Sequence, residues 1–284
     1  MTTLNGHLHL VCAAEARGTF LAEQSFAAPM HISKPYWDGE TLLVNVVNQT
    51  AGIFGGDVIR TRVEVRSGAR VLLSSPSAAR FHPSRGRESR LEQHFFVRAG
   101  GSLDVFPEIS IPQKESRSFQ RTTMDVEPGG ELVYLETLTP GRVASGETFA
   151  FERYAWATDV RVGGQLVHRE RAAIMPGDRS VAGLRALFPA SYHAGFIVIS
   201  PGTEKWTGFP AEVAALGGRP TLLAGASKLT AHGWSIRLLA ADSLALRDGL
   251  HRARALIYQH LDRKPPDLRR NGDFARNPVT FASP

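Results

Sequence analysis

The chain has 284 residues, of which 43% are hydrophobic and 21% charged, and its 33 Lys and Arg outnumber its 27 Asp and Glu to give a formal net charge of +6. A chain of this size and composition can bury a large core without disulfides, so wholesale disorder is excluded. The basic residues are scattered and form no stripe with interleaved aromatic residues, so the pattern favours acidic protein partners over nucleic acid.

The N-terminal residues and the single cysteine bear on the cellular compartment. Residues 1–10 lack the apolar run of a signal peptide, and no apolar run approaches the roughly 20 residues of a membrane-spanning helix. Cys12 alone can form neither an internal disulfide nor a cysteine-rich zinc site. We therefore expect a cytoplasmic protein with no membrane role. His7 and His9 alternate in the N-terminal segment, where solvated side chains are a commoner arrangement than a metal site.

Short runs rich in Val, Leu, Phe and Thr predict β-strands from the start of the chain to Gly164. The clearest predicted strands are 41–47, 58–65, 70–74, 91–97, 122–126, 131–135 and 149–162. Because tight turns and no helices separate these strands, we expect stacked sheets with mainly antiparallel neighbours. The turns at 66–69 and 127–130 resemble each other, which is a faint sign of an internal repeat.

Helices are predicted only late in the chain. Asp242 can cap a helix whose apolar residues recur at spacings of three and four, namely Leu246, Leu250, Ala253, Ile257 and Leu261. Shorter helices are predicted at 210–216 and 180–187. The predicted fold class is therefore mainly β, with stacked antiparallel or mixed sheets, two or three helices, and the longest helix near the C-terminus. We expect one domain, 1–264, and a Pro- and Arg-containing tail, 265–284, that stays mobile or orders on a partner.

Sequence signatures of common enzyme sites are absent. There is no Gly-x-x-x-x-Gly-Lys-Ser/Thr phosphate loop, dinucleotide-binding fingerprint, Gly-x-Ser-x-Gly elbow or His-Glu-x-x-His zinc motif. The most informative segment is a turn that contains Gly52, Gly55, Gly56 and Asp57, with two apolar residues between the glycines. This composition predicts a turn pressed into the protein. Asp57 then has two interpretations: its carboxylate accepts hydrogen bonds from the turn, or it lines a channel.

Four blocks of sequence occur in order along the chain. They are the Gly-Gly-Asp turn with the run to Arg80; 126–147, which contains Pro-Gly-Arg and Gly-Glu; 166–171, Leu-Val-His-Arg-Glu-Arg; and 224–243, which ends at Asp242 and Ser243. Together these blocks, within residues 5–261, resemble the urease accessory protein family UreD, also called UreH. The family commonly has a Glu-Trp-Leu-Pro-Gln-like block where this chain has Asp-Val-Phe-Pro-Glu at 104–108.

The resemblance to UreD implies a mostly β protein without catalytic activity. It implies a complex with a UreF-like accessory protein and a UreG-like GTPase, docking on apo-urease, and transfer of nickel through an internal water-filled passage lined by acidic residues. The matching positions in this sequence are Asp57 and Glu170, and Glu147 is added on the residue pattern alone. No permanently bound cofactor is expected, only transient Ni²⁺.

The residue inventory is compatible with metal transfer independently of the resemblance. A passing Ni²⁺ needs ligands that are sparse enough to release it, and dispersed carboxylates and imidazoles suit that task better than a closed cage. A competing interpretation of Glu147 and Glu170 is structural ion pairing with Arg142 and Arg171.

Two other functions compete with urease maturation. The first is a carbohydrate-binding or carbohydrate-active β-sandwich, in which Glu136 and Glu147 would form an acid pair. The rings that would stack on sugars in this alternative are Trp37, Trp156, Trp206 and Trp234. The second is a structural β protein without metal traffic, which co-purification with accessory proteins and urease would contradict.

Overall fold

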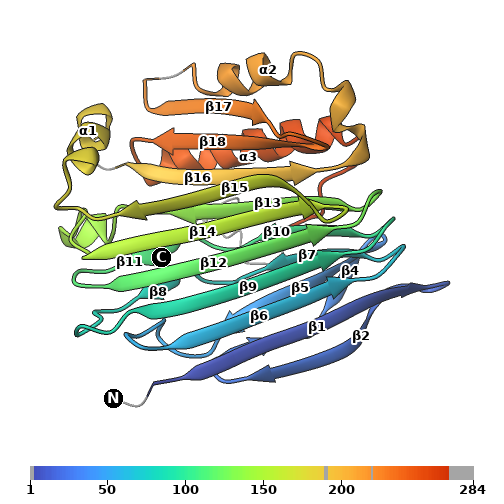
Figure 1. Ribbon diagram of the computed structural model, residues 1–284, viewed down its shortest axis with the longest axis horizontal. Coiled ribbons are helices and arrows are strands. Elements are labelled where there is room, and N and C mark those ends of the chain that lie inside the picture. The colour runs from blue at the N-terminus through green and yellow to red at the C-terminus, as the bar shows by residue number, and fades with distance from the viewer. Residues whose placement is uncertain (1–2, 189–190, 219, 269–284) are drawn as a thin grey trace, which may run out of the picture.

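Two β-sheets stacked face to face form the body of the protein (Figure 1). The computed structural model describes residues 3–188, 191–218 and 220–268. The front sheet has seven strands in the order β15-β14-β12-β9-β6-β1-β2. Their bounds are β1 (Asn5–Glu15), β2 (Gly18–Ala27), β6 (Val58–Val65), β9 (Ser89–Val97), β12 (Arg117–Val126), β14 (Arg153–Val162) and β15 (Gln165–Ile174).

The rear sheet has eleven strands, of which eight follow the order β17-β18-β16-β13-β10-β7-β5-β3. These are β3 (Met30–Ile32), β5 (Thr41–Asn48), β7 (Arg70–Ser74), β10 (Ser102–Phe106), β13 (Glu131–Leu138), β16 (Tyr192–Ile199), β17 (Leu222–Lys228) and β18 (Gly233–Ala240). Three short strands attach beside this path: β4 (Tyr36–Asp38), β8 (Ala79–Phe81) and β11 (Ser110–Pro112).

The chain alternates between the two sheets through its central strands. From β5 to β14 the long strands fall in turn on the rear and front sheets, so consecutive strands do not pair with each other. Neighbours within each sheet are therefore parallel from β1 through β6, β9 and β12 to β14, and from β5 through β7 and β10 to β13. The expected antiparallel pairing holds only at the flanks, as in β1–β2, β14–β15 and β13–β16. Each tight turn joins a strand of one sheet to a strand of the other. The chain then returns to the first sheet beside its previous strand, so parallel neighbours form without a connecting helix.

The turns that cross between the sheets stack on one another at one end of the molecule. Gly68 N donates to Gly100 O at 3.2 Å, and Gly100 N donates to Gly129 O at 3.0 Å. All three residues have φ between +73° and +88°, which glycine adopts without steric cost. The similar turns at 66–69 and 127–130 are thus two steps of one stacked ladder.

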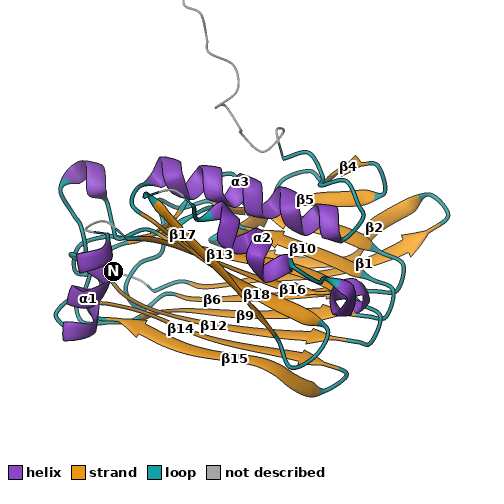
Figure 2. Cartoon of the chain, turned by 90° about the horizontal axis from the view of Figure 1, so that it is seen from above, coloured by secondary structure: helices purple, strands orange, loops and turns teal. Residues whose placement is uncertain are grey.

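The hydrophobic core has two main layers. One lies between the sheets and includes Leu10, Val63, Leu103 and Leu132. The other lies between the rear sheet and the helices α2 (Phe209–Leu216) and α3 (Ser243–His260), which cover its outer face (Figure 2). No helix in the described part of the chain covers the outer face of the front sheet.

The three predicted helices are confirmed. They are α1 (Arg179–Leu187), α2 and α3, and Asp242 caps α3 by accepting a hydrogen bond from Ala245 N at 2.8 Å. The predicted mainly β fold class, in its mixed-sheet form, is also confirmed. Among the described helices, none is long and apolar enough to cross a membrane.

Only the beginning of the predicted tail is described. Residues 265–268 lie against the domain: Asp267 N donates to Asp38 Oδ2 at 2.7 Å, and Arg254 Nη2 donates to Pro266 O at 2.7 Å. The rest of the tail, 269–284, lies outside the described residues.

Candidate functional site

A cavity of about 250 Å³ lies between the two sheets, at the end opposite to the stacked turns. Its position follows from the inward-facing residues of two front strands. Along β9 the inward side chains change from Gln93 to Phe95, and along β12 they change from Gln120 to Met124. The apolar ends of these strands close the core, and their opposite ends leave a hollow that Gln93, Gln120 and the apolar Leu91 line together.

Polar side chains from both sheets hydrogen-bond along the cavity wall. Gln120 Nε2 donates to the Tyr134 hydroxyl at 3.2 Å, and Thr122 Oγ1 donates to Gln93 Oε1 at 3.0 Å. Tyr134 is buried and belongs to β13 of the rear sheet, whereas the other three residues belong to the front sheet. The network therefore links the sheets across the cavity.

The cavity opens to solvent on one side. Exposed residues border it there, namely Thr50, Ser77, Arg80 and Glu108. Gly52 also lines this part, and a Cβ atom at Gly52 would lie 2.4 Å from Arg80 O. A Cβ at Gly55 would lie 2.2 Å from Ser84 O. The glycine turn thus packs closely against the segment 80–84, which places it beside the mouth of the cavity.

A small hollow of about 10 Å³ adjoins the cavity and shares Gln120, Glu136 and Tyr154 with it. His193 of β16 also lines this hollow. Burial raises the pKa of Glu136 to about 7, although the positive charge of Arg237 opposes the shift. Burial lowers the pKa of His193 to about 4, and the charge of Arg237 lowers it further. At neutral pH the imidazole is therefore uncharged and has a nitrogen lone pair available.

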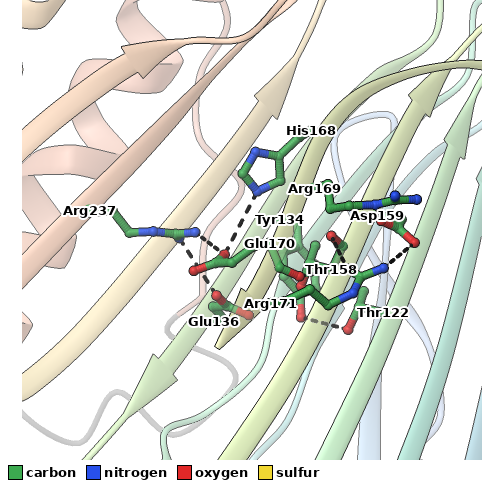
Figure 3. A network of polar contacts seen from close by, with 10 residues as sticks. All are labelled: Thr122, Tyr134, Glu136, Thr158, Asp159, His168, Arg169, Glu170, Arg171 and Arg237. Atoms are coloured by element: carbon green, nitrogen blue, oxygen red, sulfur yellow. Dashed lines mark hydrogen bonds and ion pairs between the residues drawn. The ribbon is translucent and has the colours of Figure 1, made fainter. Parts of the chain in front are cut away.

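Glu170 does not line this hollow, but Arg237 links it to Glu136, which does (Figure 3). Its carboxylate pairs with the guanidinium of Arg237, and His168 Nε2 lies 3.8 Å from Glu170 Oε2. Burial raises the pKa of Glu170, but the imidazole of His168 and the charge of Arg237 outweigh it, so the pKa lies below its usual value. The predicted ion pair of Glu170 with Arg171 is not formed, because Arg171 turns to the other face of β15 and binds Asp159 at 2.8 Å.

Asp57 is buried in the glycine turn and is not among the residues that line the cavity. Its Oδ1 accepts a hydrogen bond from Leu4 N at 2.9 Å, and its Oδ2 accepts one from Phe54 N at 2.8 Å. Both carboxylate oxygens are thus engaged by backbone amides, which is the first of the two arrangements considered for this residue. The carboxylate joins the N-terminal segment to the turn.

Glu147 lies in the loop before β14, away from the other candidate residues. Its carboxylate pairs with Arg142, and Oε2 also accepts a hydrogen bond from Lys114 N at 3.2 Å. The hydrogen bond from Arg142 is the main reason that the pKa of Glu147 is lowered. The structural ion pair considered for Glu147 is therefore present.

The tryptophans do not form a row of exposed rings. Trp206 and Trp234 are each only 6% exposed and pack in the core beneath the helices, whereas Trp37 is 54% exposed. The carbohydrate-binding alternative requires accessible rings for stacking, so it loses two of its four candidate residues.

Sequence reasoning missed Arg237 and Gly195 of the site and gave Glu136 a different role. Glu136 faces inward on β13 together with Tyr134, and Arg237 lies on β18 between the buried residues Ile236 and Leu238. A charged residue in a buried strand requires a compensating partner, and an isolated glycine such as Gly195 in a strand marks a close approach. Both signals can be recognised in the sequence, but the sequence does not show that Glu136, Gly195 and Arg237 lie side by side on neighbouring strands.

The sequence matches the family described as UreD urease accessory protein over residues 4–271. A urease accessory protein UreD of Opitutus terrae is 39% identical over 274 residues, which cover 93% of this chain and 98% of that protein. UreD of Acetivibrio thermocellus is 29% identical over 244 residues, which cover 84% of this chain and 92% of that protein. UreD of Deinococcus radiodurans is 36% identical over 182 residues, with coverage of 63% and 66%. The chain therefore belongs to the UreD family of urease accessory proteins.

Proposed function

We propose that this chain acts in the cytoplasm as a scaffold that conducts Ni²⁺ to apo-urease through the cavity between its sheets, in a complex with a UreF-like protein and a UreG-like GTPase. Membership of the family supports the role in urease maturation. The observation that carries the nickel route is the position of the acidic residues. The cavity leads from an open mouth beside Glu108 to Glu136, and Arg237 links Glu136 to Glu170.

The ligands along this route suit transfer rather than storage. Ni²⁺ binds oxygen and nitrogen ligands, and Glu136, Glu170 and neutral His193 offer both. Among the described residues, no three or more His, Cys, Asp and Glu side chains converge as a metal site. An ion that meets one or two ligands at a time is released more readily than one held in a closed cage.

Several buried polar atoms near this route have no hydrogen-bond partner. They include the hydroxyls of Thr137 and Thr158 and the Nη1 atom of Arg237. Buried polar groups in proteins are nearly always hydrogen-bonded, so such a cluster supports a route that carries water or a hydrated ion.

The test replaces the two acidic residues without changing their shape. Glu136→Gln and Glu170→Gln should each lower urease activation in cells at limiting nickel by roughly tenfold, because each replaces a carboxyl ligand on the route with a neutral amide. Excess nickel should restore activation. Glu92→Gln is the matched control, because Glu92 pairs with Arg60 on the outer face of the front sheet and is 47% exposed. Activation by the control should equal that of wild type.

Assembly is measured in the same strains. Wild type and both variants should co-purify with the UreF-like and UreG-like partners and with apo-urease. Loss of nickel-limited activation with intact assembly supports a role in conduction. Wild-type activation by both variants at limiting nickel would show that nickel does not pass these residues. Failure of wild type to co-purify with the partners would contradict the proposed complex.

A further inference from the structure

The guanidinium of Arg237 lies between two carboxylates that come from opposite sheets (Figure 3). Glu170 of β15 pairs with Nη2, and Oε1 of Glu136 in β13 lies 3.7 Å from Nη1. That second contact is an ion pair without a hydrogen bond, and Nη1 is buried with no hydrogen-bond partner. The guanidinium is therefore held firmly by Glu170 and only loosely on the side of Glu136.

Gly195 makes room for this arrangement. In the rear sheet Gly195 of β16 is paired with Glu136 on one side and with Arg237 on the other. A Cβ atom at Gly195 would lie 1.8 Å from Arg237 Nη1 and 3.4 Å from Glu136 Oε1. Any other residue at this position would displace the guanidinium, so the absent side chain allows Arg237 to reach across β16.

Arg237 and Glu170 are also partly exposed to solvent, at a place separate from the mouth of the cavity. Glu136 and His193 line the small hollow on the inner side of the pair. The side chains of Arg237 and Glu170 are 31% and 20% exposed, so the pair also has an outer side. β15 is the edge of the front sheet, and the rear sheet extends past it to β18 and β17 (Figure 1). The pair thus lies at the seam between β15 and β18.

We infer that Arg237 closes the second end of the passage as a displaceable cation, which occupies the site of Glu136 and Glu170 until a divalent cation replaces it. This inference rests on the proposed nickel route. Two partly buried carboxylates need a nearby positive charge, and the guanidinium supplies one unit of charge. A divalent ion supplies two units and binds carboxylate oxygen directly. The returning guanidinium then competes with the ion, which favours release over retention.

The test measures binding of Ni²⁺ to the purified full-length chain, alone or in its accessory complex, by equilibrium dialysis with nickel chloride. Arg237→Met removes the charge and keeps much of the side-chain length. We expect its Kd for Ni²⁺ to fall by roughly tenfold, because the ion no longer competes with the guanidinium. Arg237→Lys keeps a positive charge and should stay close to wild type. The control Arg60→Met removes an exposed arginine on the outer face of the front sheet and should also match wild type.

A second pair of variants moves the guanidinium without deleting it. Gly195→Ala places a methyl group where Arg237 Nη1 lies, and we expect Ni²⁺ binding to tighten as in Arg237→Met. Gly225→Ala is its matched control, because Gly225 of β17 pairs with Arg237 in the same row and a Cβ atom there meets nothing within 4 Å. This pair decides the question if Arg237→Met does not fold.

The outcomes separate the closing role from the route itself. If folded Arg237→Met and Gly195→Ala both bind Ni²⁺ within twofold of wild type, Arg237 does not compete with the ion and the inference is wrong, even if Glu136→Gln and Glu170→Gln impair activation. If those glutamine variants activate urease normally, the proposed nickel route itself is contradicted, whatever the binding measurements show. Tighter binding by both Arg237→Met and Gly195→Ala, with unchanged controls, supports the closing role.

Discussion

Asp57 and Asp159 are both buried aspartates, but different groups compensate their charges. The carboxylate of Asp57 accepts two backbone amides and holds the N-terminal segment against the glycine turn. The carboxylate of Asp159 binds Arg169 at 2.9 Å and Arg171 at 2.8 Å. Replacement of Asp57 would therefore loosen the turn beside the cavity mouth, so loss of urease activation by an Asp57 variant needs a stability measurement before it can be ascribed to nickel.

The two arginines around Asp159 lead to a prediction for pH dependence. Hydrogen bonding, from Arg171 above all, lowers the pKa of Asp159 from 3.8 to about 2, although burial opposes the shift. The folded state thus binds this proton more weakly than the unfolded state, so the pair stabilises the fold above pH 3.8 and loses its effect as the pH falls toward 2. We expect Asp159→Asn to lower the free energy of unfolding by about 2 kcal/mol at pH 6.

Urea unfolding of wild type and Asp159→Asn at several pH values between 3 and 6 checks this prediction. The difference between the two proteins should shrink as the pH falls through this range. A difference that stays constant from pH 6 to pH 3 would show that ionisation of Asp159 does not contribute to stability.

At the scale of elements, α3 is fixed to the rear sheet by a buried polar cluster at its C-terminal end. Asp104 of β10 accepts hydrogen bonds from the Tyr258 hydroxyl and, at 2.8 Å, from Arg263 Nη2. Arg263 Nη1 also donates to Ser102 Oγ at 2.8 Å. Asp104 and Tyr258 are almost completely buried, so the apolar stripe of α3 and this cluster together determine how the helix packs.

Removal of the Asp104 charge should destabilise the protein strongly. Asp104→Asn leaves Arg263 without its ionised partner in a buried position, which costs about 3 kcal/mol or more. Glu23→Gln is the control, because Glu23 forms a surface ion pair with Arg66 at 3.2 Å in which both side chains are about half exposed, so the pair contributes about 0.5 kcal/mol or less. Thermal and urea unfolding of both variants measure the contrast. Equal losses would show that the buried cluster does not hold α3 in place.

Local sequence patterns predict the elements of this fold better than their pairing. The bounds of β6, β7 and α2, and the cap at Asp242, follow from alternation, turn residues and capping chemistry. Parallel pairing does not follow, because it depends on the chain crossing between sheets at every turn. The same limit applies to the site: Glu170 is recognisable, but its partner Arg237 comes from a strand 67 residues away.

At the scale of the whole molecule, the cavity interrupts what would otherwise be a continuous core. One apolar cluster, which includes Phe95 and Val105, lies on one side of it, and another, which includes Ile59 and Tyr154, lies on the other. A cavity between the sheets of a sandwich gives up packing and apolar burial, so stability alone does not explain it. Its retention is consistent with a function that needs a hydrated interior.

Gln120→Leu tests whether the polar side chains that line the cavity are needed. Gln120 lines both the cavity and the small hollow, so an isobutyl group there makes their junction apolar. The variant loses the hydrogen bond to Tyr134 but gains apolar contacts, and its free energy of unfolding should stay within about 1 kcal/mol of wild type. Urease activation at limiting nickel should nevertheless fall severalfold, whereas Gln24→Leu on exposed β2 should activate urease normally. A stable Gln120→Leu protein with full activation at limiting nickel would mean that the ion takes another path, because a dry junction cannot pass a hydrated cation.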